Sequence, residues 1–538
     1  LYEIRDPQGN VITIKKSGIT HSDGQSIVFT RDTEGRITGI TDSSGKTVSY
    51  QYDGRGDLVK VTDPAGYETG FVYDSDHFLT EIIDPRGVTQ SRNEYDDNGR
   101  LIAVVDARGN RTTITSDPDN RLETVTDRLG NSTVYEYDNR GNITRITDAN
   151  GNVTRYTFDA NNNPTSKVDA LGNTTKYTYN RDGNLLTMTT PLGQKVENAY
   201  NAQSFVTSMK LFGIPQLTYT YNTEGLMTQA KDAMNQVTAF AYTEAGMLES
   251  ISDSIGTIQT FIYDDKGNVT SYVNGAGDVA AFTYNADGQA LTKSIVRTGD
   301  AAAITETYQY DQAGNVSKVI YHDGSFIGRE YNEVGMLTAA EDSEGRRNTY
   351  QYDLFGNLTR VTYYDGTFES FTYDKEHRNL TATDRQGITI TMTYDNVGNL
   401  LSKTYPNGST ETYTYDSVYR LTGQESLSGA VTSYEYDSNG RNTAITDGLG
   451  NRTVFTYNTY SQVSKVTDPR GNATSYTYDK NNRCTQVKLA NAKTIVSTYD
   501  ARGRLMTQKD PKGRITTYTY DLAERLTSVK DPMGQTCN

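Results

Sequence analysis

The chain has 538 residues and a formal net charge of −15, and only 35% of its residues are hydrophobic even though it contains 41 Tyr. This scarcity of apolar side chains, together with 47 Gly and no Trp, predicts strands and tight turns with almost no helix. So acidic a chain lacks the clustered Lys and Arg of nucleic-acid-binding proteins, and we exclude that class. No apolar run approaches the ~20 residues of a membrane span, and we recognise no signal peptide, so membrane insertion is not expected. Because the chain starts in mid-pattern at Leu1, we interpret it as a fragment whose targeting segment lies elsewhere.

A repeat organises the chain from about residue 30 onward. This length usually indicates several globular domains, but one slot recurs in 24 copies and holds Tyr in 21 of them. Asp or Asn follows the slot in every copy except at Thr243, and the first copy carries Arg31 in place of Tyr. Of the 23 steps between copies, 21 are 21 residues long, which indicates a repeat architecture. We expect residues 1–29 to be a degenerate or irregular leading repeat and residues 30–538 to be the array. Representative pairs, to which we assign a structural role, are Tyr52 and Asp53, Tyr137 and Asp138, Tyr179 and Asn180, Tyr263 and Asp264, Tyr352 and Asp353, Tyr436 and Asp437, and Tyr520 and Asp521.

Each copy contains two predicted turns. Four residues after the Tyr, Gly stands in 15 copies, and residues such as His77 and Asn120 fill the slot elsewhere. These residue types tolerate a positive φ, so we predict a left-handed turn position. Ten residues later a second Gly stands in 20 copies, as in Thr147–Gly151, where the Asp caps backbone N–H groups and the Gly completes the turn. Representative turn glycines are Gly56, Gly66, Gly141, Gly151, Gly356 and Gly366.

Two segments of about six residues lie between the turns. In the second segment of one copy, Thr154, Tyr156 and Phe158 alternate with the residues of the opposite face, which is the period of a strand. Each copy is therefore predicted to be a β-hairpin, and the copies to form one antiparallel meander of about 48 strands. Aromatic pairs such as Tyr135 and Tyr137 predict aromatic rows from hairpin to hairpin.

A sheet of this size cannot stay flat, because strand twist accumulates and large open sheets curl, split or close. Both faces carry Tyr, Thr, Asn, Arg and Lys, so neither face requires a second sheet over it. We therefore predict an all-β fold of antiparallel β-hairpin repeats in one continuous curled sheet that forms a spiral, hollow, single-layer shell. A parallel β-helix has a similar period, but its narrow interior could hardly take two tyrosines per coil. Which face lines the cavity, and how many turns the spiral makes, stay open.

Two steps break the period. The step from Tyr73 to Tyr95 has one extra residue within residues 88–95, which predicts a β-bulge. The step from Tyr284 to Tyr310 has five extra residues, which predicts a longer turn around residues 294–305. A contact loop for a partner is the alternative there.

The pattern Tyr-Asp-x-x-Gly-x-Leu, Thr-Asp-x-x-Gly and Thr-x-Tyr-x-Tyr-Asp resembles the RHS or YD-repeat family over about residues 30–538. This family includes shell-forming components of ABC toxins, RHS effectors, wall-associated proteins and teneurins. The resemblance implies a hollow β-shell, often around a C-terminal cytotoxic segment. Bacterial members usually end in a core segment with an Asp-Pro-x-Gly self-cleavage site. Asp531 stands in such a sequence, but mid-array turns have it too, so we interpret Asp531 as a turn residue and place any toxic activity outside this sequence.

The sequence predicts no catalytic site, no metal site and no cofactor. None of the four histidines, His21, His77, His322 and His377, has a repeat-breaking nucleophile or ligand set nearby. We interpret Cys484 as a small buried hydrophobe, and with Cys537 it gives no disulfide framework. Turn Asp and Asn oxygens could bind calcium, but turn capping explains the same residues and the EF-hand spacing is absent.

Two functions remain. We favour a non-enzymatic shell of a secreted or surface-exposed bacterial protein, which encloses and protects a polypeptide cargo such as a C-terminal toxin or the remainder of its own chain. The alternative is a cell-surface adhesin or carbohydrate-binding module, in which Tyr rows stack on the rings of a surface polysaccharide. Choline- and glucan-binding hairpin repeats have a similar period but are rich in Trp, which this chain lacks.

Overall fold

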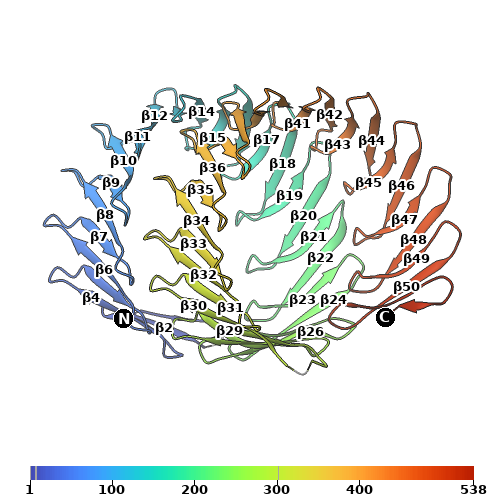
Figure 1. Ribbon diagram of the computed structural model, residues 1–538, viewed down its shortest axis with the longest axis horizontal. Coiled ribbons are helices and arrows are strands. Elements are labelled where there is room, and N and C mark those ends of the chain that lie inside the picture. The colour runs from blue at the N-terminus through green and yellow to red at the C-terminus, as the bar shows by residue number, and fades with distance from the viewer. Residues whose placement is uncertain (1, 7–8, 301, 538) are drawn as a thin grey trace.

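The computed structural model describes residues 2–6, 9–300 and 302–537 and is all-β (Figure 1). These residues form one sheet of 52 strands and no helix. Each strand pairs antiparallel with its neighbours in the chain, from β1 (Tyr2–Arg5) to β52 (Thr536–Cys537). The end strands do not pair with each other, so the sheet is unclosed. The predicted meander is confirmed.

One repeat shows how the hairpins form. β6 (Thr47–Tyr52) ends at the Tyr slot, and β7 (Leu58–Thr62) and β8 (Glu68–Tyr73) follow. Their Val, Thr, Phe and Tyr residues favour extended backbone. We call residues 53–57, and the equivalent residues of every copy, the first turn. Residues 63–67 and their equivalents are the second turn.

A β-bulge marks the Tyr slot of most repeats, a feature that the sequence analysis did not predict. In the β6–β7 pair the register shifts between Gln51 and Tyr52, and the shift recurs at the same slot along the chain. Such bulges bend a strand and increase its twist, so each repeat contributes to the curvature of the sheet. The additional bulge predicted within residues 88–95 is confirmed by a register shift between Thr89 and Ser91.

The sheet forms a spiral of about two coils. In Figure 1 it rises from β4 (Ser26–Arg31), crosses the top near β17 (Pro164–Val168) and descends to the bottom near β29 (Ala290–Val296). It then rises again through β36 (Phe368–Tyr373) and descends to β50 (Ile515–Tyr520). This answers the question of how many turns the spiral makes.

The two coils touch through their turns. Arg108, in the second turn after Tyr95, places Nη2 3.4 Å from Oδ2 of Asp353, in the first turn after Tyr352. Tyr352 opens the twelfth copy after Tyr95. Along the whole line, second turns of the first coil contact first turns twelve or thirteen copies further on. We call this line the seam.

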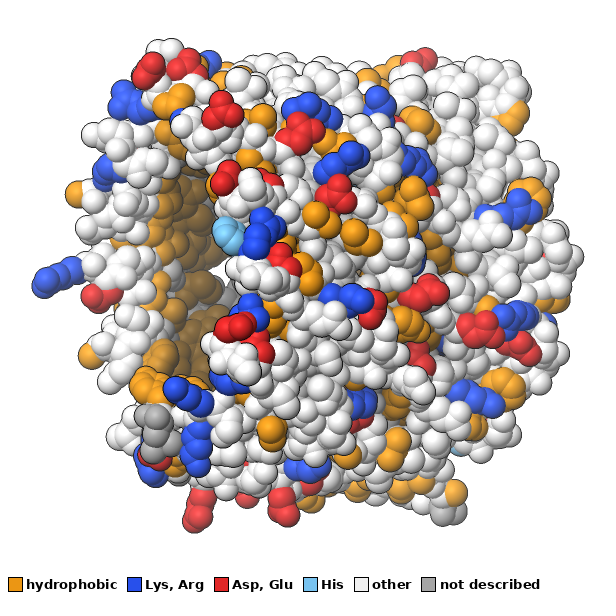
Figure 2. Space-filling model, turned by 90° about the vertical axis from the view of Figure 1, so that its left-hand side faces the viewer, with side chains coloured by type: hydrophobic (Ala, Val, Ile, Leu, Met, Phe, Trp, Pro, Cys, Tyr) orange, Lys and Arg blue, Asp and Glu red, His pale blue; other side chains and the backbone are white. Residues whose placement is uncertain are grey.

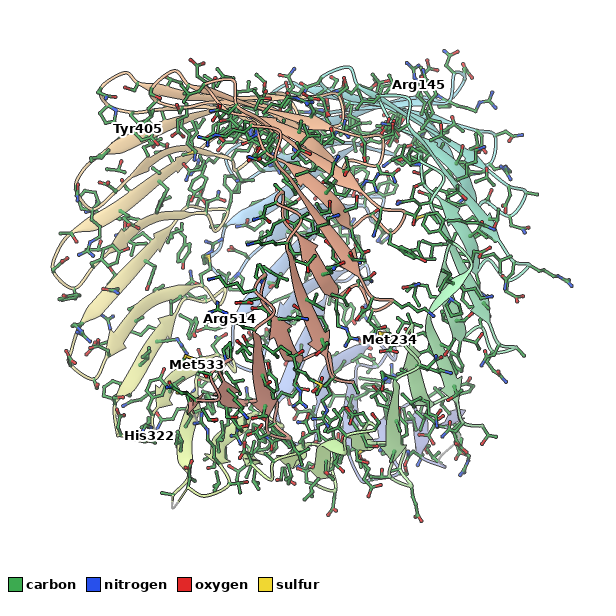
Figure 3. All side chains as sticks on the ribbon, turned by 90° about the vertical axis from the view of Figure 1, so that its right-hand side faces the viewer. Arg145, Met234, His322, Tyr405, Arg514 and Met533 are labelled. Atoms are coloured by element: carbon green, nitrogen blue, oxygen red, sulfur yellow. The ribbon has the colours of Figure 1, made fainter. Side chains whose placement is uncertain are left out.

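The two faces of the sheet differ in their side chains. In β6, Val48, Tyr50 and Tyr52 lie on one face and Gln51 on the other. Figure 2 shows hydrophobic side chains gathered on the inner surface of a hollow, whereas the outside carries mostly polar and charged ones. Arg145, on the same face as the residue before the Tyr, lies at the outer side of the wall in Figure 3. The Tyr face therefore lines the hollow, which answers the question of which face lines the cavity.

The long step between Tyr284 and Tyr310 forms a connection at residues 297–303, between β29 and β30 (Ile304–Tyr310). Ala301 lies outside the described residues. The backbone N–H of Thr298 donates to Oδ1 of Asp278 at 2.8 Å, and its hydroxyl donates to the carbonyl oxygen of Ala276 at 2.7 Å. The start of this connection thus binds the neighbouring second turn of its own sheet. The division of the chain near residue 30 stays a prediction.

Candidate functional site: the inner wall and the seam

The Asp of the Tyr-Asp pair holds the first turn together. In the turn after Tyr137, the N–H of Asp138 donates to the carbonyl of Asn142 at 2.9 Å, and the N–H of Gly141 donates to the carbonyl of Asp138 at 3.2 Å. Oδ1 of Asp138 accepts the N–H groups of Arg140 and Asn142, both at 2.9 Å. The Asn142 amide also donates to Oδ2 of Asp138. This bond is the main reason why the pKa of Asp138 lies well below its usual range; the backbone N–H groups lower it further, whereas partial burial acts in the opposite direction. At the other selected pairs, the side-chain oxygen likewise accepts hydrogen bonds from backbone N–H groups of its own first turn; these residues are Asp53, Asn180, Asp264, Asp353, Asp437 and Asp521. The oxygens considered for calcium are thus engaged by the turn itself.

The Tyr hydroxyl links each repeat to the one before it. Tyr436 donates to the carbonyl of Leu421, fifteen residues earlier, at 2.8 Å. That carbonyl lies beyond Gly423 and Ser433, the last pair of the adjoining strands at that end, so the hydroxyl satisfies a backbone group that the ladder leaves free. The same bond is made by Tyr52, Tyr263, Tyr352 and Tyr520 at 2.9, 2.7, 2.9 and 3.0 Å. This need for a hydroxyl explains why the slot holds Tyr and so rarely Phe.

Two of the selected tyrosines differ from this scheme. The hydroxyl of Tyr137 donates to Oε1 of Glu123 at 3.4 Å. For Tyr179, at the same slot, the structure gives no such hydroxyl bond to the preceding repeat. Burial is the main reason why its pKa is raised.

In six repeats an Arg side chain, and not a second Tyr, covers the Tyr ring. The Arg420 guanidinium carbon lies 4.7 Å from the centre of the Tyr436 ring. Nε of Arg420 pairs with Oδ2 of Asp416 at 2.6 Å, and Nη1 donates to the carbonyl of Asp437 in the next repeat at 2.9 Å. Arg36, Arg378, Arg441, Arg483 and Arg504 cover the next Tyr in the same way, and Phe78 and Phe205 do so in two repeats.

In these eight repeats the rings of the Tyr slot alternate with Arg or Phe. An aromatic row of the expected kind is formed by Phe261, Tyr272 and Phe282 on three neighbouring strands, with ring centres 6.5 and 6.0 Å apart. Successive Tyr slots are two strands apart, which is about 10 Å and too far for rings to stack. The slot five residues after the Tyr fills the space between them.

The representative turn glycines all have left-handed backbone. Their φ values are 96° at Gly56, 90° at Gly66, 86° at Gly141, 83° at Gly151, 89° at Gly356 and 83° at Gly366. A Cβ added at Gly366 would meet nothing within 4 Å, so conformation and not space selects Gly there.

One turn departs from the prediction. His77 adopts a φ of 68°, as expected at the Gly slot, but the positive φ expected at Asn120 belongs to Arg121, at 56°. β12 (Arg111–Asp117) pairs with β13 (Leu122–Thr126) without the usual bulge. The missing bulge moves the turn by one residue.

Buried ion pairs stabilise the seam. Nε of Arg502 lies 2.7 Å from Oδ2 of Asp253, and Nη2 donates to Oδ1 at 3.1 Å. The two side chains are only 4% and 11% exposed. Hydrogen bonds from Arg502 lower the pKa of Asp253, against the effect of burial. Lys46 with Asp287 and Arg525 with Asp278 make further pairs across the seam.

Several seam contacts come from residues that replace the first-turn Gly. Tyr419 has a φ of 66° and donates its hydroxyl to Oδ2 of Asp148, while the Asn152 amide donates to the same hydroxyl at 2.8 Å. Ser461, with a φ of 65°, binds the side chain of Gln194. From the sequence, the exceptions to the Gly slot are interpreted only as turn variants. Nine copies carry such an exception, four in the first twelve copies and five in the last twelve, so their distribution carries no signal of the seam.

The histidines and cysteines form no reactive cluster. Nδ1 of His77 lies 2.7 Å from Oδ1 of Asp57, and the His377 ring stands edge-on to Phe355 at 4.6 Å. In the described part of the chain, no group of three or more His, Cys, Asp or Glu side chains could hold a metal ion. Cys484 is partly buried and Cys537 exposed, and both are free thiols. The described residues also contain no helix long and apolar enough to cross a membrane.

A cavity of about 340 Å³ opens on the seam. Its lining includes Tyr460, Tyr476 and Tyr478, together with the amides of Gln462 and Asn482. Aromatic rings beside amide groups suit a polar ring such as a sugar.

These features define a repeat shell: a single-layer, spiral β-wall with an apolar inner face. A model of the RHS repeat matches residues 31–67, 52–89, 117–153, 137–171, 158–195 and 331–367, and a model of the teneurin YD-shell matches residues 370–537. Together they cover more than half of the chain, which belongs to the RHS/YD-repeat family. The expected resemblance is confirmed.

Solved structures share the fold. The crystal structure of TcdB2-TccC3 is 14% identical over 97% of this chain, with a TM-score of 0.54. The crystal structure of TcdB2-TccC3-Cdc42 is 16% identical over 98% of the chain, with a TM-score of 0.51. This chain spans only 39% and 32% of the length of those chains. The comparison with curated proteins found no match.

Proposed function

We propose that this chain is the wall of a container that encloses and protects a polypeptide. The observation that carries the proposal is the hollow, whose inner surface gathers hydrophobic side chains while the outside is polar (Figure 2). Soluble proteins rarely leave a large continuous apolar surface uncovered. A polypeptide inside the hollow would cover this surface. The bulges and turns that fill the repeat have a structural purpose, and we assign the wall no catalytic, metal-binding or cofactor-binding role.

The proposed cargo is a toxin segment or the remainder of the protein's own chain, and the proposed setting is a secreted or surface-exposed bacterial protein. The resemblance to toxin-enclosing shells supports both points. Within this proposal, residues 30–538 form the wall and residues 1–29 are its irregular first repeat. The reading frame after Asn538 offers a simple check. A core segment followed by an unrelated domain supports a container, whereas a wall-anchoring sequence counts against it.

A protease-protection experiment tests enclosure directly. A disordered reporter peptide with protease sites is fused after Asn538, and its cleavage is compared with that of the same peptide mixed with the unmodified chain. We expect the fused reporter to survive while the mixed reporter is cut. Equal cleavage rates would refute enclosure.

The cavity on the seam favours one alternative, a carbohydrate-binding module. Tyr460 and Tyr478 would stack on a sugar ring and Gln462 and Asn482 would bind its hydroxyl groups. Two results together would support this alternative against the container. The chain would be retained on immobilised surface polysaccharide and the variant Tyr460→Ala would not be, and the fused reporter would stay unprotected from protease.

A further inference from the structure

The Tyr slot is a site for a phenol ring, and the preceding repeat builds it. At Tyr436, the Arg420 guanidinium covers the face of the ring and the carbonyl of Leu421 accepts the hydroxyl. Both groups belong to the preceding repeat, where they stand five and six residues after its Tyr. A slot that lacked only the Tyr side chain would therefore keep its ring site, on the face that lines the hollow.

One slot of the array has no side chain long enough to fill this site. Among the 24 slot residues Ser116 alone is small, and the others are Tyr, Phe or Arg. The preceding repeat still supplies Arg100 and Leu101, five and six residues after Tyr95. The ring site is therefore built at Ser116 as in other repeats, but the wall provides no ring for it. We call this place the gap at Ser116.

The carbonyl of Leu101 has the same position in the sheet as the carbonyl of Leu421. It lies two residues beyond Ala103, whose pair with Thr113 is the last of the adjoining strands at that end. A Ser side chain is too short to reach this carbonyl from position 116. Leu101 thus presents a backbone acceptor that a Tyr hydroxyl satisfies in other repeats.

Arg100 is less covered than its counterpart in a complete slot. Arg36 also lies in a first turn of the first coil, and its guanidinium carbon is 4.8 Å from the centre of the Tyr52 ring. The Arg36 side chain is 30% exposed and the Arg100 side chain 52%. Nε of Arg36 lies 2.7 Å from Oδ2 of Asp32, whereas Nε of Arg100 lies 3.8 Å from Oδ2 of Asp96. The Arg100 guanidinium is thus available to an incoming ring.

A cavity of about 430 Å³ opens at this point between β11 (Leu101–Asp106) and β12. Its lining includes Arg100 and Leu101 on the side of β11, and Ile114 and Ser116 in β12. Ile114 and Ser116 lie on the Tyr face, since they stand two residues before the slot and at the slot itself. Ser116 is exposed, so the gap is open to the hollow.

Contact with a second coil leaves the Tyr slot open. Tyr436 precedes a first turn that lies on the seam, where Asn439 binds Leu192, whereas Tyr52 precedes a first turn of the first coil. Both Tyr side chains are partly exposed. The site at Ser116 therefore depends on the inner face of the wall and not on an uncovered rim.

We infer that the gap at Ser116 binds a Tyr side chain of the enclosed polypeptide. Enclosure rests on the proposed function, whereas the site itself rests on the geometry of the slot. Arg100 covers the bound ring with a cation–π contact, and the carbonyl of Leu101 accepts its hydroxyl. A Phe side chain makes only the first of these contacts, so Tyr binds about fivefold more tightly than Phe.

Binding of a small probe to the 538-residue chain tests the site. N-acetyl-tyrosinamide presents a Tyr side chain between two peptide groups, and saturation-transfer NMR should show that it binds about fivefold more tightly than N-acetyl-phenylalaninamide. In Ser116→Tyr the wall's own ring fills the gap, so the preference for Tyr should be lost and stability in urea should not fall. Arg100→Ala should weaken the binding of both probes about two- to fivefold.

Gln309→Tyr is the matched control, since it adds a Tyr at an exposed position one residue before a slot. This variant should bind both probes as the wild type does. Equal binding of the two probes by the wild type would overturn the inference. So would unchanged probe binding by Ser116→Tyr, or a Ser116→Tyr variant less stable than the wild type, because the gap would then not accept a ring.

A Tyr in a fused reporter tests whether the bound residue is the enclosed one. A disordered reporter with a single Tyr, fused after Asn538, should weaken probe binding severalfold by competition, and the same reporter with Ala should leave it unchanged. Both reporters should resist protease, because protection depends on enclosure and not on the Tyr. Protected reporters without competition would overturn this inference alone. Cleaved reporters would overturn the proposed container, and with it the enclosed ligand, even where the probe still binds at Ser116.

Discussion

Replacing Arg502 with Ala should weaken the seam by about 3 kcal/mol. The side chain is only 4% exposed and makes two contacts with the Asp253 carboxylate, at 2.7 and 3.1 Å. Removing one partner of a buried ion pair typically costs about 3–5 kcal/mol, since the other charge stays buried without compensation. We expect the lower end of this range, because Oδ1 of Asp253 would keep the backbone N–H groups of Ile255 and Gly256.

Arg514→Ala is the matched control. Arg514 also pairs with an Asp carboxylate, that of Asp510, but within its own second turn and with 60% of its side chain exposed. Exposed pairs contribute about 0–1 kcal/mol. Urea unfolding followed by circular dichroism should show the large loss only for Arg502→Ala, and hydrogen exchange should show it as faster exchange near Asp253. Equal destabilisation of the two variants would refute the role given to the seam.

Three further predictions follow from individual contacts. Tyr436→Phe keeps the ring but leaves a backbone carbonyl without its partner, so it should cost about 1 kcal/mol in urea unfolding; no loss would show that the hydroxyl bond is dispensable. Gly366→Ala should cost about 1–2 kcal/mol through its φ of 83° alone, with Gly366→Asn milder; equal costs would point to a clash instead of conformation. Burial would raise the pKa of Asp353, but bonds from Asn357 and the Arg108 charge across the seam lower it overall. Its contribution is therefore complete above about pH 4 and lost as the pH falls through the lowered value. Seam turns should become more sensitive to an acid protease as the pH falls below about 4, and unchanged cleavage would contradict this.

The repeat could be predicted because every local preference recurs two dozen times. Gly141 and Asp138 show the same turn chemistry in the sequence as in the structure, and the alternation around Tyr156 fixes strand and face. Curling followed from the number of strands, since strand twist accumulates in any large sheet.

The seam could not be predicted in the same way. Which turns meet depends on how many repeats complete a coil, and that number is set by small bends at bulges such as the one at Tyr52. The partner of Tyr419 thus lies 271 residues away, at Asp148, with no local signal connecting them. The hydroxyl bond of Tyr436 was also missed, because the free carbonyl that it satisfies arises only once the hairpins are in register.

Cryo-electron microscopy of the 538-residue chain tests the central claim most directly. We predict a hollow single-layer shell of about two coils, in which the turn containing Asp253 contacts the turn containing Arg502 across the seam. A straight or narrow rod, or a ribbon whose coils do not touch, would contradict the account.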